Sequence, residues 1–251
     1  MITRDELVDY LDGYLESERG VDYCPNGLQV EGRPEIKKIA AGVSLSANLI
    51  ERARALGADS LLVHHGLLWN GLVPRVRGSF KLRLAPLLAH DMNLLAYHLP
   101  LDRHLEVGTA ATVARLLGWS EIEPFGSHHG VPTGVRAEVG GASPRELAAA
   151  LERHLGRRPL MFEGRGLSIQ RAAIVTGDAF GEFQRAVDEG LDLFVTGEPK
   201  ERAMDLAREE GVHFIAAGHY HTEAPGVRAL AQHIAERFPV EVEFIDLPNP
   251  V

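Results

Sequence analysis

The sequence of 251 residues contains one cysteine, Cys24, and no long apolar run. A single cysteine excludes an intramolecular disulfide and fits a reducing compartment, so we predict a cytoplasmic protein. The polar, acidic N-terminal segment has no apolar core of a signal peptide. No segment approaches the ~18 apolar residues of a membrane span, and we therefore expect no membrane partner.

Positive charge is scarce as well. The sequence has 26 Lys and Arg against 35 Asp and Glu, a formal net charge of -9. This balance argues against direct binding of duplex DNA, which needs a basic face. A nucleotide is not excluded, because a metal ion and a few arginines can hold it.

Three common catalytic motifs are missing from the sequence. It has no Walker A sequence, no Gly-x-Gly-x-x-Gly after a strand and no Gly-x-Ser-x-Gly elbow. Thr176-Gly177-Asp178-Ala179 follows a predicted strand and precedes a helix, so it could present backbone N–H groups to an anion, but the pattern is short and unspecific.

Strand and helix patterns alternate along the chain. Thr3 with Glu6, and Ser143-Pro144 with Glu146, are helix starts with capping boxes. We expect a loop over 22–32, strands at 38–43, 60–63, 93–97, 136–139, 159–163, 172–175, 193–196, 214–217 and 240–245, and helices at 46–56, 80–90, 108–117, 144–154, 180–189, 201–210 and 227–238. Alternation of this kind predicts an α/β fold with mainly parallel or mixed sheets.

A weak internal repeat divides the chain into two pseudo-symmetric α/β halves, 1–125 and 126–251. A strand–helix–Gly–strand pattern occurs at 38–63 and again at 171–196, and it aligns His64-His65 with Gly197-Glu198. Later in each half a strand is followed by His-x-x-x-acid, at 98–102 and at 219–223. We expect strand ends of both halves to share a cleft; the alternative is that any two βαβ units look alike.

Histidines and acids gather at the predicted strand ends, where open α/β sheets bind ligands. The candidates are His64, His65, His98, Asp102, Glu198, His219, His221 and Glu223. Imidazole mixed with carboxylate suits Zn, Mn, Fe or Ni better than Mg or Ca. Five or more ligands exceed a closed structural zinc site and suggest two ions with a bridging hydroxide as nucleophile.

Each candidate also has a structural interpretation. An isolated His-His pair is more often a turn or a hydrogen-bonding pair than a metal site. Asp102 could cap a helix, and Glu223 could be a first-turn acid favoured by the helix dipole. The placement of these residues together, after apolar strands, favours the metal site.

Most of the candidate residues lie within a set of longer motifs. These are Val63-His64-His65-Gly66 with Trp69, Tyr97–Asp102, Gly218-His219-Tyr220 with Thr222-Glu223, the N-terminal motif Asn26–Val30 with Gly32, Leu193–Glu198 and Ile245–Pro250. Taken together, they resemble the GTP cyclohydrolase I type 2 homologues, also called the Nif-three-like, dinuclear-metal-centre family. The resemblance covers nearly the whole chain and matches the shorter members, which lack a large inserted domain.

The resemblance implies that His64, His65, Asp102, His219 and Glu223 bind two divalent metal ions (Zn, Fe or Mn), with Asp102 or Glu223 as the bridge. It also implies a toroidal homohexamer, a trimer of dimers. His98, Glu198 and His221 are kept as candidates that orient the ligands or transfer protons. Family members often have a small residue where His221 stands, so its role is open.

The family name implies opening of the GTP imidazole ring by water, with release of formate. The leading hypothesis is therefore a metal-dependent hydrolase acting on a nucleotide or another small molecule, through a metal-bound hydroxide. The second is a broader phosphoesterase or amidohydrolase. The third is a hexameric metal-binding scaffold or regulator without enzymatic activity.

Overall fold

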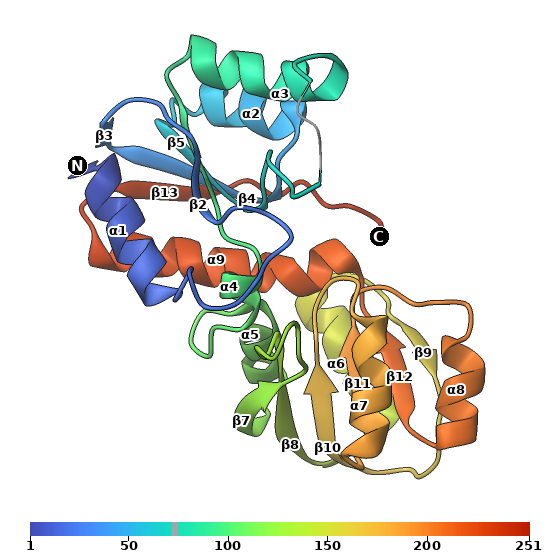
Figure 1. Ribbon diagram of the computed structural model, residues 1–251. Coiled ribbons are helices and arrows are strands. Elements are labelled where there is room, and N and C mark those ends of the chain that lie inside the picture. Colours follow the sequence, from blue (N-terminus) through green and yellow to red (C-terminus); the bar gives the residue numbers. More distant parts are fainter. Residues whose placement is uncertain (72–74) are drawn as a thin grey trace. The chain divides into compact units, whose positions relative to one another are not determined.

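A computed structural model describes residues 1–71 and 75–251. The chain forms two compact units. Unit 1 comprises Met1–Leu101 with Val227–Leu247, and unit 2 comprises Asp102–Gly226 with Pro248–Val251. Each unit contains its own sheet with helices on it (Figure 1).

Unit 1 is built on a five-stranded sheet in the order β13-β4-β5-β6-β2. The strands β13, β4, β5 and β6 run parallel, and β2 closes the edge antiparallel to β6. The elements are β1 (Ile2–Thr3), α1 (Arg4–Tyr14), β2 (Gly27–Val30), β3 (Glu35–Ile36), β4 (Lys38–Ser44), α2 (Ala47–Ala55), β5 (Ser60–His65), α3 (Gly78–Ala89), β6 (Asn93–Ala96), β13 (Glu241–Phe244) and the C-terminal part of α9 (His219–Arg237).

Unit 2 is built on a six-stranded sheet in the order β7-β8-β10-β11-β12-β9. The central strands β10, β11 and β12 are parallel, and antiparallel strands flank them on both sides. The elements are α5 (Thr109–Leu116), β7 (Ser120–Phe125), β8 (Gly134–Ala142), α6 (Pro144–Leu155), β9 (Leu160–Phe162), β10 (Ile169–Ile174), η1 (Phe180–Glu182), α7 (Phe183–Asp188), β11 (Leu193–Thr196), α8 (Ala203–Glu210) and β12 (His213–Ala216). The short α4 (Leu99–Asp102) contains the boundary between the units.

Each sheet buries apolar side chains under its helices. In unit 1, Leu49 and Ile50 of α2 pack with Leu61 and Val63 of β5. In unit 2, α5 and α6 cover one face, whereas Phe183 of α7 packs on the other. Near-continuous apolar runs such as Leu193–Thr196 are typical of strands covered on both faces. The predicted α/β fold is confirmed, with two mixed sheets.

The internal repeat is visible in equivalent hydrogen bonds at the base of the two sheets. In unit 1 the Asp59 carboxylate accepts the backbone N–H groups of Lys37 and Lys38, at 2.8 and 3.0 Å. In unit 2 the Asp192 carboxylate accepts those of Gln170 and Arg171, also at 2.8 and 3.0 Å. Both aspartates therefore bridge the first two strands of the repeat in the same way.

A second equivalent bridge joins the third strand of the repeat to a glycine. In unit 1, Asn93 accepts the N–H of Gly32 at 2.8 Å and donates to the carbonyl of Arg33 at 2.9 Å. In unit 2 a different side chain makes the same pair of bonds: His213 Nδ1 accepts the N–H of Gly164 at 3.1 Å, and its Nε2 lies 2.9 Å from the Arg165 carbonyl. The neutral His213 tautomer with its proton on Nε2 satisfies both bonds.

The two glycines of this bridge are required by close packing. A Cβ at Gly32 would lie 2.5 Å from the backbone of Met92, and one at Gly164 would lie 2.6 Å from that of Gly211. Neither site admits a side chain without movement of the main chain.

The structure corrects the alignment of the two His-x-x-x-acid segments. Tyr97 N donates to Val63 O at 3.0 Å, and Ala217 N donates to Thr196 O at 2.8 Å, so Tyr97 and Ala217 are equivalent. His98 is then equivalent to Gly218 and not to His219. The two segments share a sequence pattern, but they are displaced by one residue in the structural repeat.

Several elements differ from the sequence expectation at the places where function was predicted. Strand β5 extends through His64 and His65, because Ser44 of β4 still pairs with His65. Helix α9 begins at His219, whereas it was expected from Val227. The expected loop over 22–32 contains β2, whose Leu28 pairs with Leu95 of β6.

The division into compact units differs from the expected halves 1–125 and 126–251. Strand β13 pairs with β4, Glu241 opposite Lys38, so the C-terminal strand belongs to the sheet of unit 1. Residues 102–125, which include α5 and β7, belong to unit 2 because β7 pairs with β8. In the described part of the chain, no helix combines the length and apolar character needed to cross a membrane.

Candidate metal centre

Three histidines come together in unit 1 at the carboxyl ends of β5 and β6. His64 and His65 end β5, and His98 follows β6. One ring nitrogen of each lies within 4.8 Å of those of the other two. His64 is fully buried, and the side chain of His98 is 12% exposed. Three imidazoles at this spacing can hold a transition metal.

Each of the three imidazoles is oriented through its Nδ1. His64 Nδ1 lies 2.8 Å from the carbonyl of Tyr97, and His65 Nδ1 lies 2.8 Å from Ser44 Oγ. His98 Nδ1 lies 2.7 Å from Asp22 Oδ1. An oxygen at Nδ1 fixes the ring and directs Nε2 toward a ligand, as in metal-binding histidines generally.

Asp22 belongs to a small hydrogen-bond network around His98. Its Oδ2 accepts from Asn26 Nδ2 at 2.8 Å and from the N–H of Leu99 at 2.9 Å, and Asn26 Oδ1 accepts the N–H of His98 at 2.7 Å. Burial raises the pKa of Asp22, but the hydrogen bond and charge of His98 outweigh it and lower the pKa below its usual value. Asp22, Cys24 and His98 form a further group with ligand spacing.

In unit 2, two acids hold His219 from both sides of its ring. His219 Nδ1 lies 2.6 Å from Glu198 Oε1, and Nε2 lies 2.9 Å from Glu223 Oε1. His219 and Glu223 are four residues apart in the first turns of α9, so both project from one helix face. Glu198 comes from the loop after β11.

The two carboxylates raise the proton affinity of His219. Burial lowers its pKa, but hydrogen bonds and charge from Glu223 and Glu198 outweigh this and raise the pKa to about 9. Without a metal ion His219 is therefore a cation at neutral pH. A divalent cation would take the place of the proton between Nε2 and Glu223.

Two glycines make room for this group. A Cβ at Gly177, which has a φ of 68°, would lie 2.7 Å from Glu223 Oε1. A Cβ at Gly197 would lie 2.7 Å from the Cα of His219. The loops after β10 and β11 can approach α9 only because these positions lack side chains.

Asp102 accepts hydrogen bonds from two hydroxyl groups of unit 2. Its Oδ1 accepts from Thr109 Oγ1 at 2.7 Å and from Thr176 Oγ1 at 3.3 Å. The residue is 7% exposed. The hydroxyls leave Asp102 in a polar setting suited to a carboxylate ligand.

His221 points elsewhere. Residues two apart on a helix do not share a face, so His221 is turned from His219. A Cβ at Gly218 would lie 2.8 Å from His221 Nδ1 and from Arg157 Cδ. A role for His221 in orienting ligands or transferring protons stays a prediction.

The structure thus groups the predicted residues within each unit: His64, His65 and His98 in unit 1, and Glu198, His219 and Glu223 in unit 2. Sequence reasoning missed the partners of two of these histidines, Asp22 of His98 and Ser44 of His65. Asp22 lies 76 residues from His98 in the chain, and no local spacing marks such a pair. Only the sheet brings the loop before β2 to the end of β6.

The donors present in each unit are of types that a transition metal accepts. The four histidines His64, His65, His98 and His219 all have an oxygen at Nδ1, and Glu223, 2% exposed, supplies a buried carboxylate. Oriented imidazoles with carboxylate are the ligands that zinc, iron and manganese accept.

Comparison with known proteins gives consistent matches over the full chain. A family model described as Duf34/NIF3 (NGG1p interacting factor 3) matches residues 2–250. A protein of Pseudomonas aeruginosa named GTP cyclohydrolase 1 type 2 homolog is 45% identical over 252 residues, covering 99% of each chain.

Solved structures agree with this match. The protein ybgI, described as of unknown function, superposes with a TM-score of 0.94 at 41% identity, and covers 100% of both chains. TTHA1606 from Thermus thermophilus gives a TM-score of 0.92 at 38% identity, also over 100% of both chains.

Proposed function

The chain belongs to the Duf34/NIF3 family, and on that premise we propose that it is a dinuclear metal-binding protein that acts as a metal-dependent hydrolase. The observation that carries the proposal is the orientation of the histidines. Each of His64, His65 and His219 has its Nδ1 bound to an oxygen, which prepares Nε2 as a ligand. Structural histidines do not need this shared arrangement.

The proposed ligands come from both units. His64 and His65 of unit 1, with Asp102, His219 and Glu223 of unit 2, would hold two divalent ions of zinc, iron or manganese. Asp102 or Glu223 would bridge the ions, since a carboxylate has two oxygens to share. Glu198 would keep His219 oriented through Nδ1.

The reaction would be hydrolysis of a nucleotide or another small molecule. The relatives' name suggests the specific version, in which water opens the imidazole ring of GTP and formate is released. The ions, when bound, would lower the pKa of water and polarise the bond attacked. His98, held by Asp22 at Nδ1, would exchange a proton with the substrate at Nε2.

Elemental analysis tests the proposed metal binding, and a formate assay tests the proposed reaction with GTP. We expect about two metal ions per chain in the purified protein and metal-dependent formate release from GTP. His64→Ala should lose both. His90→Ala is the matched control, because His90 is an exposed histidine at the end of α3.

The outcomes separate the hypotheses. Two ions per chain without formate above the His64→Ala background would exclude the GTP reaction, and a panel of phosphoesters and amides would then define the substrate. Two ions without turnover on any substrate would favour a metal-binding scaffold or regulator. A metal content near zero after gentle purification would contradict the dinuclear centre itself.

The same proposal includes a homohexamer arranged as a trimer of dimers. Exposed apolar side chains on α3 support an additional interface, since Leu82 is 66% and Leu88 is 59% exposed. Light scattering should give six times the chain mass of 27.4 kDa. A monomer at micromolar concentration would contradict this part.

A further inference from the structure

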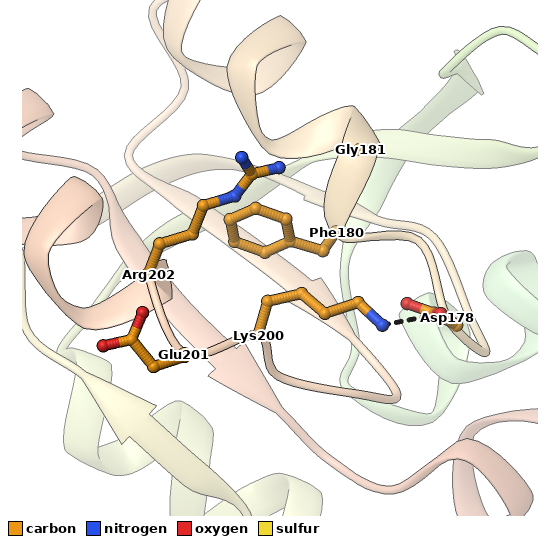
Figure 2. A pocket seen from close by; sticks show the side chains of 6 residues that line it. All are labelled: Asp178, Phe180, Gly181, Lys200, Glu201 and Arg202. Carbon is orange, nitrogen blue, oxygen red and sulfur yellow. Dashed lines mark hydrogen bonds and ion pairs between the residues drawn. The ribbon is translucent and has the colours of Figure 1, made fainter.

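A pocket of about 490 Å³ lies in unit 2 beside the loops that follow β10 and β11. Its lining residues are Asp178, Phe180, Gly181, Lys200, Glu201 and Arg202, shown in Figure 2. We call it the loop pocket. Its volume is in the range of small-molecule sites, and carboxyl ends of parallel strands are where α/β sheets bind ligands.

The main chain around the loop pocket is fixed by hydrogen bonds between the two loops. The carbonyl of Gly177 accepts the N–H groups of Gly197 and Glu198 at 2.9 and 3.1 Å. Thr196 Oγ1 donates to the same carbonyl at 3.1 Å and accepts the N–H of Ala179 at 3.3 Å. The two loops are therefore tied together before any ligand binds.

Two cations of the pocket are held in different ways. The ammonium of Lys200 lies 2.8 Å from Asp178 Oδ2, and this hydrogen bond raises the pKa of Lys200. The Arg202 guanidinium lies 5.0 Å from the ring centroid of the buried Phe180. Among residues 1–71 and 75–251, no carboxylate forms an ion pair with Arg202, so its planar set of N–H donors can receive a ligand.

The acids of the pocket set the kind of anion that can bind. Asp178 already neutralises Lys200, and the Glu201 carboxylate points away from the Lys200 ammonium (Figure 2). A singly charged carboxylate would gain little by competing with Asp178. A phosphate carries more charge and has oxygens enough to bind the Arg202 fork and Lys200 together.

We propose that the loop pocket binds the phosphate part of a phosphorylated small-molecule substrate. This inference rests on the proposed hydrolase function and narrows its substrate class. The loop that carries Lys200 and Arg202 also carries Glu198, which binds the proposed metal ligand His219 at 2.6 Å. One loop therefore supplies both the anion-binding cations and the support of the metal ligand.

The test is calorimetric titration of inorganic pyrophosphate into the full-length protein as purified. Arg202→Gln and Lys200→Gln should each weaken pyrophosphate binding at least tenfold. Arg208→Gln is the matched control, an exposed arginine of α8 outside the pocket, and should bind like wild type. Citrate, with a similar charge on carboxylates, should bind at least tenfold more weakly than pyrophosphate.

The same titration in a variant of a proposed metal ligand distinguishes this inference from the metal proposal. In His65→Ala, verified as folded by circular dichroism, pyrophosphate binding should persist and should still be lost with Arg202→Gln. Binding that disappears with His65→Ala alone would assign pyrophosphate to the metals and overturn the inference. Equal binding by all cation variants, or citrate binding as tight as pyrophosphate, would overturn it as well.

Discussion

The sheets of unit 1 and unit 2 share a scaffold but differ where the strands end. Asp59 and Asp192 make the same two backbone hydrogen bonds at the start of the repeat. At the opposite ends, His64-His65 of β5 correspond to Gly197-Glu198 after β11. Bonds that hold the sheet are therefore retained in both copies, whereas strand ends carry different chemistry in each.

The largest expected effect is on metal affinity, and it tests whether the proposed ligands of unit 1 and of unit 2 bind the same pair of ions. We expect His65→Ala in unit 1 and Glu223→Ala in unit 2 each to weaken binding of both metal ions by more than about 100-fold, since loss of a residue that only orients a ligand already costs 10–100-fold. Competition with a chromophoric chelator would measure both affinities. Loss of only one ion in each variant would instead show two independent sites and would break the proposed shared centre.

The pH dependence of metal binding should distinguish the two units next. His219 lies between two carboxylates, whereas His64 and His65 have a carbonyl and a hydroxyl as partners. With the pKa of His219 raised to about 9, a metal must displace its proton at neutral pH. Apparent affinity should therefore rise about tenfold per pH unit between roughly pH 7 and 9.

For the metal-free protein, the expected effect of rising pH is the opposite: the stability of the folded state decreases. Protonated His219 stabilises the folded state because its pKa is raised. This contribution is complete below pH 6.5, the ordinary pKa of histidine, and it is lost as the pH rises through about 9. Glu198→Gln should lower the pKa of His219 and shift both dependences to lower pH. Calorimetry in buffers of different ionisation enthalpy would count the protons released; no release at pH 7 would contradict the assignment.

Substitution of the equivalent aspartates Asp59 and Asp192 should have a smaller effect, on the free energy of unfolding. Asp59→Ala removes the acceptor of two backbone N–H groups and the partner of Arg33, and we expect a loss of about 3 kcal/mol in free energy of unfolding. Asp192→Ala removes two equivalent bonds at a more exposed place and should cost about 2 kcal/mol. Urea unfolding would measure both; a negligible effect in either would show that the bridge is not a common support.

The smallest effect is expected when a residue of unit 2 is replaced by the residue type at the equivalent position of unit 1. Asn93 and His213 make equivalent pairs of bonds, so His213→Asn should keep both and cost no more than about 1 kcal/mol. His213→Leu leaves the part-buried N–H of Gly164 and carbonyl of Arg165 without this partner and should cost about 2 kcal/mol. Thermal unfolding would compare the variants, and equal losses would show that packing and not hydrogen bonding matters here.

Sequence reasoning predicted the elements that depend on local signals. The capping boxes of Thr3 with Glu6 and Ser143 with Glu146 are both present, and the apolar runs at 60–63 and 193–196 are strands. It did not find β2, because Gly27 and the prolines near it suggest turns, and only pairing with β6 makes this segment a strand. Tertiary pairing overrode local preference at that edge.

The sequence predicted which residues belong to the candidate site, but not which side chains hydrogen-bond to them. Histidines after apolar strands have a visible pattern, and His64 and His65 do lie at a strand end. The pairs that orient them, such as His98 with Asp22 and His65 with Ser44, join segments far apart in the chain. Such contacts follow from sheet order, which spacing does not encode.

The pairing of β13 with β4 has a consequence for the order of folding during synthesis. Unit 2 between Asp102 and Gly226 is one continuous segment, whereas the sheet of unit 1 lacks its edge strand until Glu241–Phe244 has been made. His64 and His65 are thus translated early on a sheet that is completed last. A nascent chain can close unit 2 first, so the sheet that carries His64 and His65 is completed only after Glu241–Phe244 has been synthesised.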